Sequence, residues 1–305
     1  MKTIVFGGSG FIGSHVADAL TDQGHKVVIF DLKPSPYIRP EQEMIIGNIL
    51  DEEAAAKAVE GCDYVYHFAG IADLDGARTK SLETVTQNIK GTVILLEAAR
   101  QAKVKRFIFA STVYVYSDKG GFYRCSKQAA EFYMEEYQKQ YGLDYTILRY
   151  GTVYGPRSDQ RNSVRRYLTQ ALEEERIVCS ASGEEMREYI HVRDAARLSV
   201  EILSNKHRNQ HVIITGHHPM RFKDFLSTIK EILGNKISLE IKDPHFDLAH
   251  YNLTPYSFIP KVGYKLTTNC YLDMGQGLLE CLNEIHSEIH RVGRDSKDIQ
   301  KESLK

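Results

Sequence analysis

The sequence predicts an α/β protein in which helices cover both faces of a doubly wound, parallel β-sheet. Two observations lead to this class. Short apolar segments alternate with longer helical patterns through the first 150 residues, and a glycine-rich turn joins the first apolar segment to the first helix. Strands and helices that alternate at this spacing form right-handed βαβ units, which assemble into a parallel sheet. The looser pattern after residue 155 predicts a second, smaller α+β region.

Each expected strand of the first half is a short apolar segment that ends in a small or polar residue. We expect strands at residues 2–8, 25–31, 43–48, 63–70, 105–111 and 144–151. The helical patterns between them cover residues 10–24, 51–61, 81–102 and 123–142. Gly24 ends the first of these helices, because glycine readily adopts the conformation in which helices stop.

The second half contains shorter elements. Helical patterns cover residues 163–175, 193–204, 222–233 and 272–289, and strand patterns cover 176–180, 187–192, 211–216 and 237–242. Residues 243–270 are rich in proline, histidine, asparagine and tyrosine, which predicts a loop.

Composition excludes several classes of partner. A net charge of −1 over 305 residues provides no field for nucleic acid or an anionic membrane surface. No apolar segment approaches the roughly 20 residues that cross a bilayer, and we expect no signal peptide. The five cysteines are scattered without metal-binding spacing, so we expect reduced thiols, no metal site and a cytoplasmic protein.

The segment VFGGSGFIGSHVADAL predicts a nucleotide site between the first strand and the first helix. Gly8, Gly10 and Gly13 fit G-x-G-x-x-G, and Gly7, Gly10 and Gly13 also fit G-x-x-G-x-x-G. Such glycines allow a tight turn and a close approach of the backbone to a pyrophosphate, which the N–H groups of the helix N-terminus bind. The alternative is a glycine-rich turn that binds no ligand.

Asp31 supports the dinucleotide interpretation. It ends the second strand, 18 residues after Gly13. An acidic side chain there accepts hydrogen bonds from the ribose hydroxyls and repels a 2′-phosphate, which favours NAD over NADP. Lys33 lies close enough to weaken this preference, and Asp31 could also simply begin a turn.

We therefore divide the chain by expected role. Residues 1–160, with a return segment at about 192–216, form the expected dinucleotide-binding (Rossmann) domain. Residues 161–191 and 217–290 form the smaller α+β substrate-binding region. Residues 291–305 are expected to be a polar tail.

The segment GFYRCSKQAAEFY places Tyr123 one helical turn before Lys127. A free tyrosine has a pKa of about 10, and a lysine on the same helical face favours its phenolate. The same spacing is common on exposed helices without catalytic function, so the pattern alone leaves both interpretations open.

The order of the motifs GGSGFIG, HFAG, NIKGT, ASTVYVYS, YRCSK, LRYGTVYGPR and REYIHVRDAA resembles that of the extended short-chain dehydrogenases/reductases. The most similar subgroup is the NAD-dependent nucleotide-sugar epimerases and dehydratases. The resemblance extends from residue 1 to about residue 285. It implies an enzyme with NAD as cofactor and a nucleotide-sugar as substrate.

The resemblance also implies catalytic roles. Tyr123 is the expected general base and later acid, and Lys127 tunes its pKa and holds the nicotinamide ribose. The family places the active hydroxyl four residues before a tyrosine, here Tyr116, which selects Thr112 over Ser111. Thr112 would orient the sugar hydroxyl, and Ser111 would contact the cofactor.

Other residues are implied to line the two ligands. Asn48 stands where the family usually has aspartate, and Thr152 stands where it usually has asparagine. Thr112, Thr152 and Arg187 are the expected substrate ligands, although Arg187 could instead form a surface ion pair with Glu184 or Glu185. The expected cofactor-binding residues are Gly7, Gly10, Phe11, Ile12, Gly13, Asp31, Leu32, Asn48, Ile49, Phe68, Ala69, Gly70, Ser111, Tyr123, Lys127 and Tyr150.

Departures from the family indicate the reaction. Sugar 4,6-dehydratases have Asp-Glu after the active threonine, and decarboxylating members use the same glutamate position, but here Val113 and Tyr114 follow Thr112. This favours a 4-epimerase that oxidises C4 transiently. A 4-dehydrogenase or ketoreductase with net redox is the alternative, and a 4,6-dehydratase or a non-catalytic dinucleotide sensor is less favoured.

Two further expectations concern substrate and partner. Thr112 and Tyr123 are only 11 residues apart, where the family usually has a longer loop that contacts the sugar, so the identity of the sugar stays open. The helices around 82–101 and 124–141 carry apolar residues on more than one face, which predicts a homodimer through them. Alternatively, these aromatics pack only inside the chain.

Overall fold

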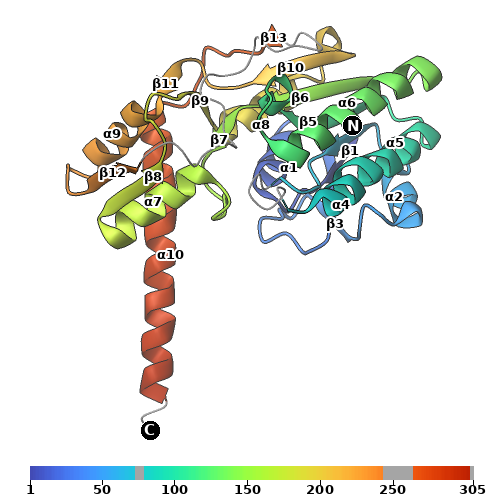
Figure 1. Cartoon of the computed structure of the whole chain (residues 1–305). Helices are drawn as coiled ribbons and strands as arrows, with labels where there is room; N and C mark the ends of the chain where they lie inside the picture. The colour runs from blue at the N-terminus through green and yellow to red at the C-terminus, as the bar shows by residue number, and fades with distance from the viewer. Residues whose placement is uncertain (73–78, 243–263, 303–305) are drawn as a thin grey trace.

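The computed structural model describes residues 1–72, 79–242 and 264–302, and its largest element is a parallel sheet (Figure 1). The sheet has eight strands in the order β13-β10-β6-β5-β4-β1-β2-β3, and every neighbouring pair is parallel. This confirms the predicted doubly wound α/β class. The strands are β1 (Lys2–Phe6), β2 (Lys26–Asp31), β3 (Glu43–Ile46), β4 (Tyr64–His67), β5 (Arg106–Thr112), β6 (Tyr145–Tyr150), β10 (Gln210–Ile214) and β13 (Tyr264–Lys265).

The strand order locates the ligand crevice. The chain proceeds from β1 through β2 to β3 on one side and from β4 onward on the other, so the order reverses between β1 and β4. Ligands of open α/β sheets bind outside the carboxyl ends of the strands at such a switch point.

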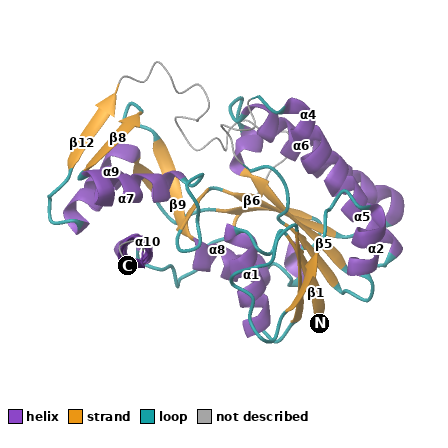
Figure 2. Cartoon of the chain, turned by 90° about the horizontal axis from the view of Figure 1, so that it is seen from below, coloured by secondary structure: helices purple, strands orange, loops and turns teal. Residues whose placement is uncertain are grey.

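Helices cover both faces of the sheet (Figure 2). α2 (Glu52–Val59), α5 (Gly91–Gln101) and α6 (Gly121–Tyr141) lie on one face, and α1 (Phe11–Asp22) and α8 (Val192–Glu201) lie on the other. β5 contributes side chains to the hydrophobic cores on both faces of the sheet. Phe107 and Phe109 face the first set of helices, and Ile108 faces the second.

The helix predicted at 81–102 contains an irregular segment. α4 (Ser81–Thr84) continues as a π-helical segment, Val85–Lys90, before α5 begins. Asn88 in this segment accepts a hydrogen bond from the Ile71 N–H (2.7 Å) and donates to the Ile71 carbonyl (2.9 Å) and to Ser126 Oγ (2.9 Å). Its buried amide therefore fixes the segment after β4 against α6.

The smaller region has its own core. α7 (Ser163–Glu174), α9 (Phe222–Ile232) and α10 (Met274–Glu302) pack around Leu168, Phe225 and Leu278. Two small sheets accompany them. They comprise β7 (Thr152–Tyr154), β9 (Met186–His191) and β11 (Pro219–Arg221), and β8 (Arg176–Ser180) with β12 (Ser238–Lys242).

Several boundaries differ from the prediction. β7, β11 and β13 were not predicted, because strands of two or three residues leave too short a pattern. α10 continues to Glu302, through most of the expected polar tail, since charged residues of both signs are compatible with a helix. Residues 243–263 of the expected loop and 303–305 of the tail lie outside the described residues. No helix in the described ranges is long and apolar enough to cross a membrane.

Candidate active site at the carboxyl edge of the large sheet

The glycine-rich turn after β1 forms a close-packed cradle. Gly7, at φ +79°, donates its N–H to the Phe30 carbonyl at 2.8 Å. A Cβ on Gly13 would lie 2.2 Å from the Gly7 carbonyl oxygen, which explains why glycine is needed there. Gly10 is the N-cap residue of α1 and has no side chain to cap the N–H groups of the helix N-terminus. Phe11 and Ile12 belong to this first turn, which fits a pyrophosphate.

Asp31 lies beside this cradle. Its Oδ2 accepts a hydrogen bond from the Ser9 N–H at 3.0 Å, and Ser9 Oγ donates to the Lys33 carbonyl at 3.0 Å. The end of β2 is thereby tied to the glycine turn, with a half-buried carboxylate at the edge of the crevice. This placement fits the predicted ribose ligand. Leu32, the next residue, is 61% exposed.

Asn48 and Ile49 follow β3. Asn48 is exposed, and its side-chain oxygen accepts a hydrogen bond from the Leu50 N–H at 3.0 Å. The Ile49 side chain is buried in the core, close to Gly91 of α5. The predicted contact between Ile49 and the cofactor would therefore involve the main chain of Ile49.

The segment after β4 forms the opposite side of the cradle. A Cβ on Gly7 would lie 2.5 Å from the Ala69 nitrogen, so the turns after β1 and β4 touch at the switch point. Gly70, at φ +139°, approaches Asn88 so closely that a Cβ would lie 2.6 Å from Asn88 Oδ1. Phe68 is half-buried and its ring centroid lies 6.2 Å from that of Tyr150. Phe68, Ala69 and Gly70 thus lie next to the glycine turn, and their contact with the cofactor stays a prediction.

The three predicted catalytic residues come together at the end of β5. Thr112 is the last residue of this strand, and its side chain lies near the Tyr123 hydroxyl in the first turn of α6 and lowers the pKa of that phenol. Lys127 is buried, and its Nζ donates to the Ala110 carbonyl at 2.7 Å. The same Nζ lies 5.8 Å from the centroid of the Tyr123 ring.

Burial dominates the electrostatics of this pair. It raises the pKa of Tyr123 to about 12, although the nearby Thr112 side chain acts in the opposite direction. Burial also lowers the pKa of Lys127 to about 8, although the Glu131 carboxylate raises it. Lys127 is thus mostly protonated at neutral pH, and Tyr123 is a neutral phenol.

Two predicted cofactor ligands direct their hydroxyls elsewhere. Ser111 donates to the buried Glu131 carboxylate, because strand residues alternate faces and Ser111 shares the α6 side with Phe109. The Tyr150 hydroxyl is hydrogen-bonded to Ser199 Oγ at 2.6 Å, on the α8 side. The prediction gave Ser111 and Tyr150 a contact with the cofactor; their hydroxyls are hydrogen-bonded inside the protein, and the cofactor contact stays a prediction.

The expected substrate ligands lie on adjacent strands of a small sheet. Thr152 of β7 pairs with Tyr189 of β9, and Arg187 of β9 pairs with Met220 of β11. Glu184 forms ion pairs with Lys223 and Arg221, while Glu185 accepts a hydrogen bond from the Ser182 N–H at 2.7 Å. Arg187 as a phosphate ligand stays a prediction.

The short connection between Thr112 and Tyr123 is held against α6. It begins as a 3₁₀ turn, Val113–Tyr116, and reaches α6 through Gly120 at φ +91°. Arg124 Nη1 donates to the Ser117 carbonyl and Gln128 Nε2 to the Val115 carbonyl, both at 2.8 Å. Arg124 and Gln128 were not predicted, although their i, i+4 spacing places them on one helical face.

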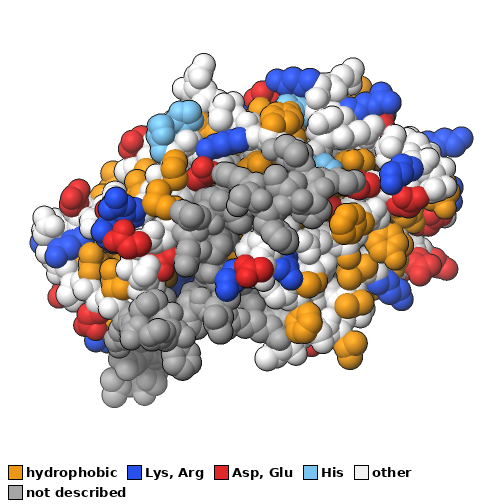
Figure 3. Space-filling model, turned by 45° about the horizontal axis from the view of Figure 1, so that its top comes forward, with side chains coloured by type: hydrophobic (Ala, Val, Ile, Leu, Met, Phe, Trp, Pro, Cys, Tyr) orange, Lys and Arg blue, Asp and Glu red, His pale blue; other side chains and the backbone are white. Residues whose placement is uncertain are grey.

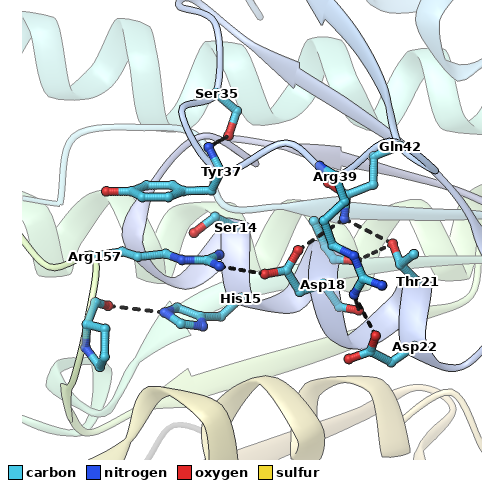
Figure 4. Close-up of polar contacts among 12 residues, drawn as sticks. Ser14, His15, Asp18, Thr21, Asp22, Ser35, Tyr37, Arg39, Gln42 and Arg157 are labelled. Atoms are coloured by element: carbon cyan, nitrogen blue, oxygen red, sulfur yellow. Dashed lines mark hydrogen bonds and ion pairs between the residues drawn. The ribbon is translucent and has the colours of Figure 1, made fainter. Parts of the chain in front are cut away.

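The sequence did not predict a polar cluster in which Arg157 lies beside α1 (Figure 4). Arg157 pairs with Asp18 of α1 at 2.8 Å and lies over the Tyr37 ring, 4.6 Å from its centroid. The backbone N–H of Arg157 donates to the Glu284 carboxylate of α10 at 2.9 Å. His15 Nε2 is 3.1 Å from the Pro156 carbonyl. Arg157 lies within the LRYGTVYGPR motif, which is the signal that could have indicated it.

The family model of the NAD dependent epimerase/dehydratase family matches residues 3–215, a span that contains every candidate site residue named above. The chain belongs to this family. It is therefore an enzyme of the NAD-dependent epimerase and dehydratase type, as predicted.

Individual relatives agree with this assignment. An uncharacterized UDP-glucose epimerase of Bacillus subtilis is 28% identical over 80% of this chain and 85% of its own length. A UDP-N-acetyl-alpha-D-glucosaminuronate decarboxylase of Bacillus cytotoxicus is 30% identical over 67% of this chain and 72% of its own length.

Two solved structures are similar over nearly the whole chain. The UDP-glucose 4-epimerase of Thermotoga maritima with UDP-glucose has a TM-score of 0.82 and 25% identity, covering 95% of this chain and 100% of that one. The UDP-glucuronic acid 4-epimerase of Bacillus cereus with UDP-glucuronic acid and NAD has a TM-score of 0.80 and 25% identity, covering 94% and 99%.

Proposed function

We propose that this enzyme is an NAD-dependent nucleotide-sugar 4-epimerase. The observation that carries the proposal is the Thr112 side chain near the Tyr123 hydroxyl, without a carboxylate at the two positions after Thr112. An alcohol can be deprotonated there, but elimination of the C6 hydroxyl lacks its usual acid and base. The similar 4-epimerase structures support the same reaction.

Each residue has a defined task in this reaction. The N–H groups at the start of α1 bind the dinucleotide pyrophosphate, and Asp31 accepts the ribose hydroxyls. Thr112 holds the sugar C4 hydroxyl, and Tyr123 removes its proton. When bound, NAD would accept the hydride from C4 and return it to the opposite face of the keto sugar, and its positive charge would favour the phenolate. After the keto sugar turns its other face, Tyr123 returns the proton to the C4 oxygen.

We infer that the substrate is a UDP-sugar. The names of the relatives and solved structures above all contain a UDP-sugar or its derivative. Arg187 would bind the diphosphate through charge-assisted hydrogen bonds, and Thr152 would contribute a neutral hydroxyl where an amide is usual.

The proposal is tested with the purified protein. Its bound dinucleotide is identified by mass spectrometry, and UDP-glucose, UDP-galactose and UDP-glucuronate are each incubated with it and followed by NMR. We expect a C4 epimer without net change of absorbance at 340 nm. A stoichiometric absorbance change would instead establish the net dehydrogenase or ketoreductase.

Tyr123→Phe tests the role of the phenol. We expect kcat to fall by about 10²–10⁴-fold, because general acid–base catalysis contributes that much. The matched control is Tyr133→Phe, which removes a hydroxyl from an exposed tyrosine of the same helix. Equal activity of the two variants would refute the catalytic role and favour a dinucleotide sensor.

We also propose that the protein is a homodimer through the helices around 82–101, which comprise α4 to α5, and 124–141, which lie in α6. Apolar side chains gather on the side of the molecule that carries these helices (Figure 3). Leu82, Phe122, Phe132, Tyr133 and Tyr141 are between 46% and 82% exposed. Sedimentation or light scattering should give twice the chain mass, and Phe132→Glu should shift it toward the monomer.

A further inference from the structure

A buried ion cluster lies directly beneath the proposed catalytic pair. Glu131, one helical turn after Lys127, is only 5% exposed. Its carboxylate accepts hydrogen bonds from Ser111 Oγ and from Arg149, whose Nη2 and Nε lie 2.6 and 3.1 Å away. Arg149 is 2% exposed and also donates to the Tyr116 hydroxyl at 2.6 Å. The proposed reaction assigns no task to this cluster, although desolvating two charges is costly.

Glu131 completes a series of contacts between α6 and the end of β5. The Tyr123 hydroxyl lies near the Thr112 side chain, Lys127 donates to the Ala110 carbonyl, and Glu131 accepts from the Ser111 hydroxyl. These three helix residues are spaced one turn apart, and a helix is stiff over that distance. The carboxylate also reaches the neighbouring strand through Arg149. The contacts of Glu131, in the third turn of α6, therefore help to hold Tyr123 and Lys127 in position relative to Thr112.

We propose that Glu131 is a positioning residue that acts through Lys127, holding α6 in register on β5 and keeping the Lys127 ammonium charged. This inference rests on the proposed catalytic role of Tyr123 and Lys127. It assigns Glu131 two separable effects: the charge of the carboxylate acts on the proton affinity of Lys127, and its hydrogen bonds act on the placement of α6.

The surroundings of Lys127 make the charge effect strong. His67 of β4 faces Lys127, and burial holds its pKa well below the ordinary value, so this imidazole is neutral. Arg149 of β6 is bound to Glu131, and Tyr123 is a neutral phenol. Glu131 is the charged group that raises the pKa of Lys127, whereas burial lowers it to about 8. Removing the Glu131 charge therefore moves this pKa further down, toward or below neutrality.

The first test measures the Lys127 pKa by NMR of protein labelled with ¹³C at the lysine ε-carbons, with Lys127→Arg used for assignment. Glu131→Gln is expected to lower the Lys127 pKa by about 1–2 units, as for a unit charge one helical turn away. The matched control is Glu135→Gln, because Glu135 is 6% exposed on the same helix and its partner His211 lies 3.1 Å away. The control should leave the Lys127 pKa within about 0.3 units of the wild-type value. An unchanged pKa in folded Glu131→Gln would overturn the inference.

Glu131→Asp separates charge from placement and replaces Glu131→Gln if that variant does not fold. The shorter side chain keeps the charge but withdraws from Ser111. We expect a Lys127 pKa close to wild type together with a loss of about tenfold in kcat and little change in KM. A wild-type kcat would refute the placement effect.

The pH–rate profile gives the second readout. The alkaline limb, where Lys127 loses its proton, should move to lower pH in Glu131→Gln and stay in place in Glu135→Gln. Failure of the proposed function would be recognised separately: no UDP-sugar would be converted by the wild-type protein, while the Lys127 pKa would still respond to Glu131→Gln.

Discussion

Gly120→Ala is expected to disturb the active site through the short connection before α6. Gly120 has φ +91°, and a Cβ there would lie 2.9 Å from Tyr114 Cδ1, 3.1 Å from Arg124 Cβ and 3.2 Å from Tyr114 Cβ. Gly121 has φ +50° with nothing within 4 Å of the corresponding Cβ position. Both substitutions introduce backbone strain of about 1 kcal/mol. Only Gly120→Ala also crowds its neighbours, which adds about 1–3 kcal/mol.

The two variants therefore form a matched pair. Denaturant unfolding should show a free energy of unfolding lower by about 1 kcal/mol for Gly121→Ala and by about 2–4 kcal/mol for Gly120→Ala. Because Arg124 is adjacent to Tyr123, Gly120→Ala should also lower kcat by up to about 100-fold, the usual effect of a misplacement of about 1 Å. Gly121→Ala should retain kcat within about threefold. Equal losses of stability and kcat in the two variants would refute the reasoning that close packing of Gly120 against Tyr114 and Arg124 determines the geometry of the active site.

Other predictions address the cofactor site and acid stability. Gly13→Ala should abolish NAD retention, measured by mass spectrometry of the purified protein, because the new Cβ would lie 2.2 Å from the Gly7 carbonyl oxygen. Asp31→Asn should reduce the preference for NAD over NADP in a binding titration by about tenfold or more, because the amide no longer repels a 2′-phosphate. The free energy of unfolding should fall as pH falls from about 6.5 to about 4, with wild-type denaturant titrations as the measurement. Buried imidazoles bind a proton in the unfolded chain at pH values where they remain neutral in the folded protein, so stability rises with pH in this window. The groups concerned are His15, His191 and His211, whose pKa values burial lowers to about 4. A flat pH dependence between 4.5 and 6.5 would contradict this assignment.

The parts of the fold that depend on local pattern were predictable. The alternation of apolar segments and helices defined the order of the central elements. The glycines of the first turn indicated a tight turn, and the structure has a close approach of Gly7 and Gly13 there. The Tyr123–Thr112 contact was predictable as well, because one residue ends a strand and the other begins the next helix. These features need only short-range sequence information.

Contacts between distant segments were not predictable. The direction of the Ser111 side chain depends on which face of β5 meets α6, and its partner Glu131 lies 20 residues later. Arg149 reaches the same carboxylate from the neighbouring strand. Arg157 contacts Asp18, 139 positions earlier, and Glu284, 127 positions later. A single sequence has no periodic signal for such pairs, since each is determined by how the layers pack.

The pKa order within the catalytic pair explains why a buried carboxylate is useful beneath it. Tyr123 has a pKa of about 12 and Lys127 of about 8, so rising pH deprotonates the lysine before the phenol. Alkaline conditions thus remove the positive charge that favours the phenolate, and cannot by themselves activate Tyr123 as a base. The Tyr123 phenol can act as a base only when Lys127 stays protonated and a second positive charge, that of the NAD⁺ ring, lies beside it. Glu131 opposes the loss of that proton, so its charge widens the pH range over which both conditions hold.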